Sequence, residues 1–462
     1  MGSGRSRLGW VFVFGFVMPV LAGAQTVPSE LEALRAQLEM LQQRLTALEQ
    51  AQSEQAAAVA VQAASNAEQQ ESIDRTTDSL AQTRAGIGEW VSRFQWRGDL
   101  RYRNETIDQE FTSSARNRDR IRARIGFQAK VNDTVRVEVR AATGQGTDAR
   151  SANQTLTDAN SDKALDLDLA YAEWQASDQW RLTLGKMRYP WARTSSYFYD
   201  GDVNPEGVAV NWQQGALGWF GGAYYMHLAE RSSQADSNML GAQLGWRGDI
   251  TDGARVTVAA SYFDHGAVEG YNPFLGSSAA NAYGNTLTTR TDICRRGITT
   301  CLANDYNITN LMGELATTLA GRPLTVFVDY ARNGAADYSN PFSNPLLAAP
   351  AGLDTAYAVG FTYGRASSST PRSWEVGYTY QKTEKDALFA QWIDSNFTDG
   401  NSDGEGSVVR FAYSFARNWR ANATYFMNTT NIDVPVQVSV PVPRIVSDRD
   451  YRRLQLDLNM TF

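Results

Sequence analysis

Arginines occupy alternate positions along three neighbouring segments of the chain, 91–107, 116–131 and 134–144. Residues two apart in a β-strand project from the same face. We therefore expect one face of a sheet to carry Arg97, Arg101, Arg103, Arg118, Arg120, Arg122, Arg124, Arg136 and Arg140. Guanidinium groups bind carboxylates and phosphates through paired N–H donors, which favours a surface that attracts anions. The alternative is structural, with the arginines neutralising carboxylates on the same face.

The sequence offers little for catalysis or metal binding. His227 and His265 are the only histidines and lie far apart, so we expect neither a catalytic triad nor a histidine metal site. The segment DGNSDG, 399–404, matches the first half of a calcium loop, but Arg410 stands where the bidentate glutamate belongs. We interpret it as an acidic loop. No phosphate loop, dinucleotide fingerprint or nucleophile elbow occurs, so we expect neither an enzyme nor a cofactor, and the net charge of −7 argues against nucleic acid as a partner.

The N-terminus predicts export. Arg5 and Arg7 precede an apolar run, and small residues at 22–24 provide a cleavage site, so residues 1–24 are expected to be a signal peptide. Exported proteins can keep disulfides, and we predict one between Cys294 and Cys301, the alternative being two free thiols. No later run approaches the roughly 20 apolar residues of a membrane-spanning helix. If the protein crosses a membrane, it does so with strands.

Residues 25–88 are predicted to form a coiled coil in the periplasm. Leucines at 31, 34, 38, 41, 45 and 48 alternate spacings of three and four, as in a heptad seam. The same frame then meets several Gln and Asn residues, and polar layers of this kind fix register and strand number. We expect identical chains as partners, and Gly86 and Gly88 to end the helix. The alternative is a solitary amphipathic helix packed on its own domain.

The remainder, 89–462, contains sixteen stretches with strand character, and the connections between them are sorted by length. Short turns alternate with mainly long loops, the longest being 145–163, 188–205, 266–306, 334–351, 385–404 and 431–448. Sorting of this kind puts short and long connections at opposite ends of a sheet, which is the plan of a transmembrane β-barrel and not of a soluble sandwich. The stretch 266–306 could hide another hairpin, which would give eighteen strands.

The two ends of the predicted barrel strengthen this interpretation. In the last segment, YRRLQLDLNMTF, apolar and polar residues alternate as far as Phe462. Pairing this strand with the first one would remove an exposed edge that hydrocarbon does not tolerate. Near the short turns lie Trp174, Trp180, Trp212, Trp246, Trp374 and Trp419, as expected of an aromatic girdle at one membrane interface.

The chain resembles known exported barrels at this level of detail. The segments RDRIRARIGFQAKVN, SANQTL, LDLDLAYAEW, LGKMRYP and DGDVNPEGVAV are similar to the proteobacterial proteins grouped as putative porins, and the helical prefix is similar to the coiled coil ahead of some sugar-specific porins. A final strand ending in Phe462 resembles the signal that the barrel-assembly machinery reads in Gram-negative outer-membrane proteins. The resemblance implies an outer-membrane channel and names no solute.

The third outside loop, residues 188–205, has the position of the loop that folds into the pore in such proteins, and we expect it to do so here. Its aromatic residues could anchor it on the inner wall, and Asp200, Asp202 and Glu206 would then face the arginines. A surface cap is the alternative. With the arginines in excess at the narrowest point, where low-dielectric walls focus the field, we expect mild anion preference.

We expect a passive channel for small hydrophilic solutes and ions, assembled as a homotrimer in the outer-membrane lipid. A substrate-selective channel for an anionic or sugar-like solute is the first alternative. A structural tether, in which the rod is the working part, is the second.

Overall fold

The computed structural model describes residues 27–144, 148–274, 279–336, 352–440 and 442–462. The chain divides into two compact units, Met1–Glu89 and Trp90–Phe462, which are described separately. Among the described residues, no helix has the length and apolar character needed to span a membrane.

One long helix, α1 (Val27–Ser92), makes up the described part of the first unit. Leucines of the predicted seam are exposed along it, with Leu34 at 65% and Leu48 at 68%. The expectation that Gly86 and Gly88 end the helix was wrong, because α1 continues through both to Ser92. A glycine within a helix costs only about 1 kcal/mol relative to alanine, which a long helix tolerates.

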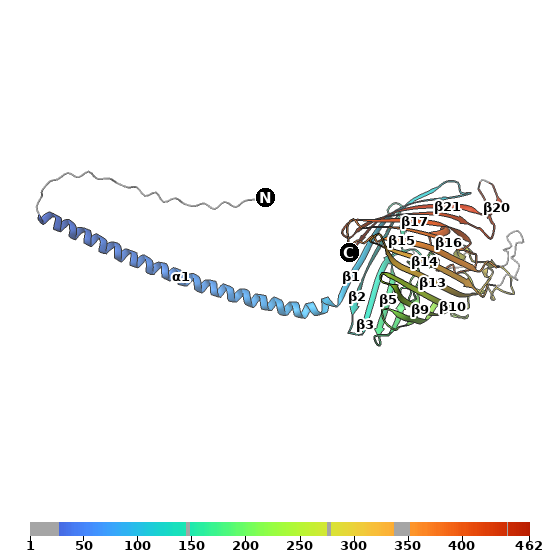
Figure 1. Cartoon of the computed structure of the whole chain (residues 1–462), viewed down its shortest axis with the longest axis horizontal. Helices are drawn as coiled ribbons and strands as arrows, with labels where there is room; N and C mark the ends of the chain where they lie inside the picture. The colour runs from blue at the N-terminus through green and yellow to red at the C-terminus, as the bar shows by residue number, and fades with distance from the viewer. Residues whose placement is uncertain (1–26, 145–147, 275–278, 337–351, 441) are drawn as a thin grey trace. The chain divides into compact units, whose positions relative to one another are not determined.

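The second unit is a closed antiparallel barrel of sixteen strands, which confirms the predicted fold class (Figure 1). Each strand pairs with the next along the chain, and β21 pairs with β1 to close the ring. In chain order the barrel strands are β1 (Phe94–Gln109), β2 (Arg116–Lys130), β3 (Val135–Thr143), β5 (Leu165–Gln175), β6 (Trp180–Lys186), β7 (Glu206–Gln213), β8 (Gly218–Ala229), β9 (Ser237–Thr251), β10 (Ala254–Gly266), β13 (Tyr306–Leu319), β14 (Arg322–Asn333), β15 (Thr355–Gly364), β16 (Trp374–Thr383), β17 (Gly404–Ala416), β18 (Trp419–Thr430) and β21 (Arg449–Thr461).

The short elements outside the ring lie in the long connections. In the stretch that could have hidden a hairpin, β11 (Leu287–Thr288) pairs only with β12 (Cys301–Leu302), so it adds no barrel strand. The other short elements are β4 (Gln154–Thr155), β19 (Val436–Val438), β20 (Arg444–Val446), and the 3₁₀ helices η1 (Ala279–Ala282) and η3 (Phe397–Gly400).

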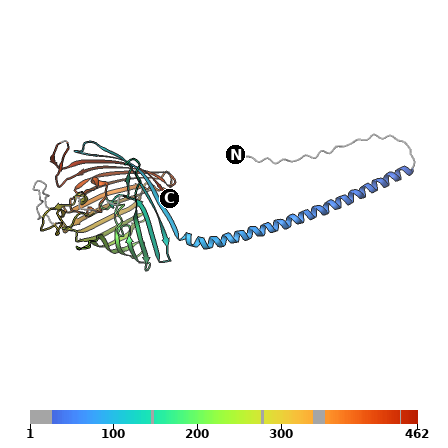
Figure 2. The same ribbon diagram turned by 180° about the vertical axis from the view of Figure 1, so that it is seen from behind.

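The last residue closes the barrel at the short-turn end. The Phe462 backbone N–H donates to the Gly98 carbonyl at 3.0 Å, and the Gly98 N–H donates back to the Phe462 carbonyl at 2.9 Å. In Figures 1 and 2 the C-terminus lies at the end of the barrel opposite β20 and the other long connections. The predicted sorting of connections is therefore present in the fold.

The barrel is apolar outside and polar inside, as β21 shows. Arg453 and Gln455 are 2% and 3% exposed, whereas Leu456 and Leu458 are 47% and 41% exposed. A soluble sheet would bury the leucines and expose the arginine. The reverse arrangement suits a barrel whose outer face meets hydrocarbon.

One strand departs from the expected alternation. In the sequence, Leu165, Leu167, Leu169 and Tyr171 occupy alternate positions of β5, which would place them on one face, but the register with β3 shifts between Arg140 and Ala141. The extra residue, Asp168, is a β-bulge, which moves later side chains to the opposite face. Leu169 is consequently buried, and the Tyr171 hydroxyl donates to the inward-facing Glu138 at 2.8 Å.

Candidate functional site: the barrel interior

Most of the expected arginines of β1 and β2 point into the barrel and lie against carboxylates there, namely Arg103, Arg118, Arg120, Arg122 and Arg124. Glu105 is fully buried and accepts hydrogen bonds from Arg118 and, at 2.5 Å, from Arg453 of β21. Arg120 lies 3.5 Å from the same carboxylate. Arg103 makes two bonds, of 2.6 and 2.8 Å, to Asp457.

A second cluster joins the wall to the third outside loop. Asp99 accepts hydrogen bonds from Arg122 at 2.8 Å and from Arg124 at 2.6 Å. Asp202 of the loop lies 3.4 Å from Arg122 and 3.7 Å from Arg124. It also accepts the Ala152 backbone N–H at 3.1 Å. Asp202 is thus the carboxylate that meets the arginines as expected.

The arginines of β3 belong to separate pairs. Arg140 bonds to Asp168, and Arg136 bonds to Glu173. Arg136 is half exposed, and no ion pair links it to the cluster around Asp99. The expected group of Arg122, Arg124, Arg136 and Arg140 is therefore split.

Two of the expected arginines lack a carboxylate partner in the described part of the chain. Within the described residues, neither Arg97 nor Arg101 forms an ion pair with a carboxylate. Arg97 donates to Gln95 at 3.1 Å, and Arg101 donates to the Asn153 side chain at 2.6 Å. The wall is thus a salt-bridge ladder with an excess of positive charge, which lies at Arg97 and Arg101 and also around Glu105, since three arginines share that one carboxylate.

The loop between β6 and β7, residues 187–205, lies inside the barrel and crosses its lumen. Trp191 packs on the inward side chains of Tyr224 and Phe263, with ring centroids 5.3 and 4.8 Å away. Further along the loop, the hydroxyls of Thr194 and Ser196 donate to Asp329 of β14 at 2.7 and 2.8 Å. Contacts to β8, β10 and β14 on one side and to β2 on the other require a path across the interior.

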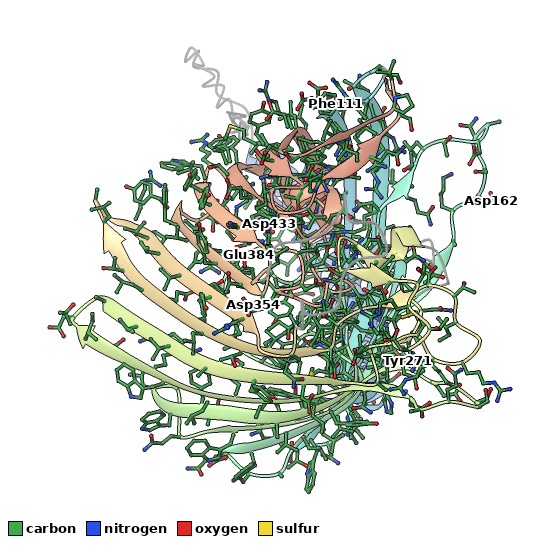
Figure 3. All side chains as sticks on the ribbon, turned by 90° about the vertical axis from the view of Figure 1, so that its right-hand side faces the viewer. Phe111, Asp162, Tyr271, Asp354, Glu384 and Asp433 are labelled. Atoms are coloured by element: carbon green, nitrogen blue, oxygen red, sulfur yellow. A yellow bond between two sulfur atoms is a disulfide. The ribbon has the colours of Figure 1, made fainter. Side chains whose placement is uncertain are left out.

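A second loop, residues 384–403, fills the interior beside the first. Ala387, Leu388, Phe389 and Ala390 are almost fully buried and join one apolar cluster with Trp191 and with wall residues of β8–β15. The two loops are joined because Asp200 N–H donates to the Trp392 carbonyl at 2.8 Å and Ser395 N–H donates to the Asp200 carboxylate at 2.8 Å. Viewed onto the long-loop end, side chains extend across the opening, with Glu384 and Asp433 near its middle (Figure 3).

The other two acidic residues do not pair with the arginines that they were expected to face, which corrects that part of the prediction. The Asp200 carboxylate accepts the backbone N–H groups of Asp202 and Ser395 and, among the described residues, forms no ion pair with an arginine. Burial raises the pKa of Asp200 well above its usual value, and the charges of Asp394 and Asp202 add to this, which weakens it further as a counter-charge. Glu206 pairs with Lys186 at 2.7 Å and is largely exposed.

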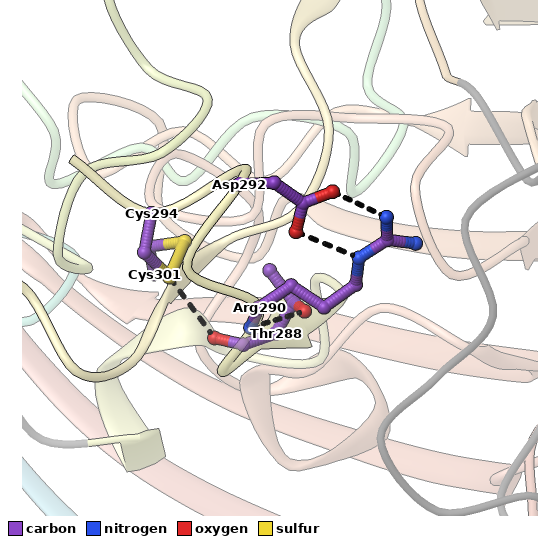
Figure 4. Close-up of a disulfide and its surroundings, with 5 residues drawn as sticks. All are labelled: Thr288, Arg290, Asp292, Cys294 and Cys301. Carbon is purple, nitrogen blue, oxygen red and sulfur yellow. Dashed lines mark hydrogen bonds and ion pairs between the residues drawn. A yellow bond between two sulfur atoms is a disulfide. The ribbon is translucent and has the colours of Figure 1, made fainter.

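The remaining candidate residues have structural surroundings. Cys294 and Cys301 form a disulfide with Cα atoms 5.5 Å apart, in the loop that also holds the Arg290–Asp292 ion pair (Figure 4). His265 is buried, and its Nδ1 lies 2.9 Å from the Tyr306 carbonyl oxygen. No group of three potential metal-binding side chains occurs within the described ranges.

Sequence reasoning missed the acidic partners of the arginines. Glu105, Asp168, Glu173 and Asp457 each bind an inward-facing arginine. Glu105 and Asp457 occupy the inward positions of their strands, so the alternation that identified the arginines could also have identified these two. Asp168 could not be assigned in this way because it forms the bulge.

Comparisons with known proteins agree with this geometry. The family described as "Putative porin" matches residues 106–301 and 284–460. No curated protein sequence matches the chain. Among solved structures, Pseudomonas putida OprB at high pH has a TM-score of 0.50 at 10% identity, covering 83% of this chain and 97% of OprB. Lower scores are found for two other solved structures. A trimer form of Vibrio cholerae OmpT has a TM-score of 0.42 at 15% identity, covering 80% of this chain and 99% of OmpT. Salmonella typhi OmpF in complex with daunomycin has a TM-score of 0.43 at 10% identity, covering 80% of this chain and 97% of OmpF.

Proposed function

Since this chain belongs to the putative porin family, we propose that it is an outer-membrane channel through which small hydrophilic solutes and ions diffuse passively. The observation that carries this function is the closed barrel with leucines on its outer face and a charged ladder on its inner face. Charged side chains inside a barrel need water or counter-charges, and a water-filled path supplies the former.

The path for solutes follows the wall made by β1, β2, β3 and β21. Much of the interior next to β8–β15 is filled by the apolar cluster of the two inward loops, which favours a polar route on the opposite side. On the arginine side, the loop presents Asp202 and Asn204 to the wall. Ions therefore pass between the loop and the ladder.

Purified full-length protein in a planar lipid bilayer tests the channel function. Stable stepwise ion conductance is expected. A protein that inserts but conducts no ions would contradict the proposal and favour the tether, in which α1 is the working part.

Mild anion preference follows from Arg101, which forms no ion pair with any described carboxylate and shares the field of Asp202 with Arg122 and Arg124. Permeating ions respond mainly to charges at the narrow part, since distant charges are screened within about 8 to 10 Å at physiological salt. The Arg101→Gln variant should shift the zero-current potential in a KCl gradient toward cations, while folding is preserved. The double variant Arg122→Ala/Arg124→Ala should shift it further, because it leaves Asp99 and Asp202 without partners.

The matched control is Arg452→Gln, which removes the same charge from an outward position of β21. It should leave the potential unchanged. An equal shift in Arg452→Gln, or none in Arg101→Gln, would show that the interior arginines do not set selectivity.

The assembly that we propose is a homotrimer in the Gram-negative outer membrane, with α1 in the periplasm. Residues 1–24 would be removed as a signal peptide, and the barrel-assembly machinery would read the last strand ending in Phe462. What supports the trimer is the exposed leucine seam of α1, since large apolar side chains in a row on a free helix call for partner helices.

A further inference from the structure

A polar cavity lies on the inner wall at the short-turn end of the barrel. Its volume is about 140 Å³, and it is lined by inward residues of β5–β9 and by residues of the turns between them. Pro190 and Ala192 of the loop that crosses the lumen form its roof. A solute that passes the loop would enter this cavity next.

Carboxamides dominate the lining. Gln175, Gln179, Asn211, Gln213 and Gln243 all contribute to it. Two of them hold the roof, because Asn211 Nδ2 donates to the Pro190 carbonyl at 2.9 Å and Gln243 Nε2 donates to the Ala192 carbonyl at 2.8 Å. The loop above the cavity is thereby fixed, and the other amide atoms can bind a solute.

Hydrogen-bonding capacity is left unused in the cavity wall. Asn211 Oδ1 and Arg181 Nε are both buried without a hydrogen-bond partner. The nearest carboxylate oxygen to Arg181, on Glu173, is 3.8 Å from Nε, beyond hydrogen-bond range. Gln213 makes no side-chain hydrogen bond to any described residue. An acceptor, a donor and a complete amide therefore face the same space.

The described residues that line the cavity include two arginines, Arg181 and Arg247, and no carboxylate. Glu173 lies 3.8 Å from Arg181 Nε but is also bound to Arg136. Arg247 donates to Thr257 at 3.2 Å and covers the ring of Phe220 at 5.3 Å, which holds an aromatic side chain in the wall. Amides, two guanidinium groups and an aromatic ring favour a ligand that carries several hydroxyl groups.

We propose that this cavity, below Pro190 and Ala192, binds a small polyol as it moves through the channel. A hydroxyl group both donates and accepts, so it can satisfy the Asn211 acceptor and the Arg181 donor together. The volume lies below the roughly 300 to 1,000 Å³ of pockets for drug-sized ligands, which limits the occupant to a single small solute. The inference rests on the proposed solute channel and gives it a preferred cargo class.

The test combines binding and conduction in the full chain. Glucose binding to the protein in detergent micelles is followed by saturation-transfer difference NMR, and block of ion current by glucose is followed in a planar bilayer. We expect saturable glucose binding and a matching reduction of current.

Variants assign the binding to the cavity. Arg181→Ala should raise the half-saturating glucose concentration about tenfold, which corresponds to about 1.4 kcal/mol. Gln213→Ala, which breaks no hydrogen bond of the fold, should raise it severalfold. The control Asn459→Ala removes an inward amide of β21 that does not line the cavity, and it should leave binding unchanged.

The outcomes separate the cavity from the channel. Absence of saturable glucose binding in NMR, or glucose binding insensitive to both cavity variants, would each overturn the polyol site, whatever the conductance. Glucose binding that depends on Arg181 and Gln213 in a protein without ion conductance would support the site and contradict the proposed channel.

Discussion

At the scale of single residues, the interior depends on buried ion pairs. Glu105 is fully buried and Arg453 is 2% exposed, so neither charge is solvated by bulk water. Burying two charges is costly, and such a pair is stable only while each keeps its partner. The arginine ladder is therefore a structural element as well as a lining.

Glu105→Gln should destabilise the barrel strongly. Removing one partner of a buried pair leaves an unpaired charge and typically costs about 3 to 5 kcal/mol. Denaturant unfolding in detergent measures the loss. As a control, Asp249→Asn removes the exposed partner of Arg255, and an exposed pair of that kind contributes much less to stability than a buried one. Equal losses in the two variants would refute the idea that burial sets the cost.

Asp433, in the outside loop that follows β18, provides a pH-dependent contact. Its pKa is raised to about 6, first by burial and then by the charge of Asp403. Asp403 accepts the backbone N–H groups of Asp433 and Val434 at 2.7 and 3.2 Å. Because the folded-state pKa exceeds the unfolded one, stability from this group is present at low pH and is lost as the pH rises through about 6.

Lowering the pH from 7 to 5 should therefore stabilise the loop around Asp433. Amide hydrogen exchange of residues 432–438 at the two pH values, corrected for intrinsic rates, measures this. In Asp433→Asn the dependence should disappear, since the side chain is then neutral throughout. If these amides were better protected from exchange at pH 7 than at pH 5, the predicted direction of the pH dependence would be wrong.

At the scale of elements, the loop of residues 187–205 divides the lumen. Asp329 fixes its middle by accepting both hydroxyls, Thr194 and Ser196, and an amide hydrogen bond from Asn310 at 2.6 Å. The apolar cluster fixes its aromatic end. The width of the path on the arginine side is thus set by how firmly this loop is held against β14.

Asp329→Ala should widen the path or make it fluctuate. The variant removes the acceptor for three hydrogen bonds and leaves the loop free to move toward or away from the wall. Single-channel recording should show a larger or noisier current than in the unmodified protein. Asp354→Ala is the control, because Asp354 pairs with Arg332 and does not contact this loop. An unchanged current in Asp329→Ala would mean that the aromatic anchors suffice.

At the scale of the whole molecule, the helix and the barrel have separate tasks. The barrel closes on itself through β1 and β21 and has its own interior contacts. The helix α1 has no comparable core of its own, and its leucines are exposed in the single chain. Partner helices would bury them.

Deleting residues 30–84 should leave an inserted, conducting barrel and loosen the trimer. Chemical cross-linking and native mass spectrometry of the two forms measure the change. A full-length control with Leu38→Ser and Leu45→Ser keeps the rod but disrupts the seam, and it should loosen the trimer as the deletion does. If the deletion and the double serine variant both resist dissociation into single chains as strongly as the unmodified protein, α1 has another purpose.

The sequence alone determined the features that depend on local spacing. Alternating side chains gave the strands, the lengths of the connections gave sixteen strands with two distinct ends, and the pattern up to Phe462 gave the closure of the barrel. These rules hold because a strand places residues two apart on one face, whatever lies beyond it.

Only the tertiary structure decided which charges meet. Glu105 and Arg453 are 348 positions apart, and no local rule pairs them. The bulge at Asp168 and the turn of Asp200 toward Ser395 depend on neighbours from other segments. In this barrel, the partners come from neighbouring strands that are distant in the sequence, such as β1 and β21, and from loops that cross the lumen. The path of those loops is set by packing and not by periodicity.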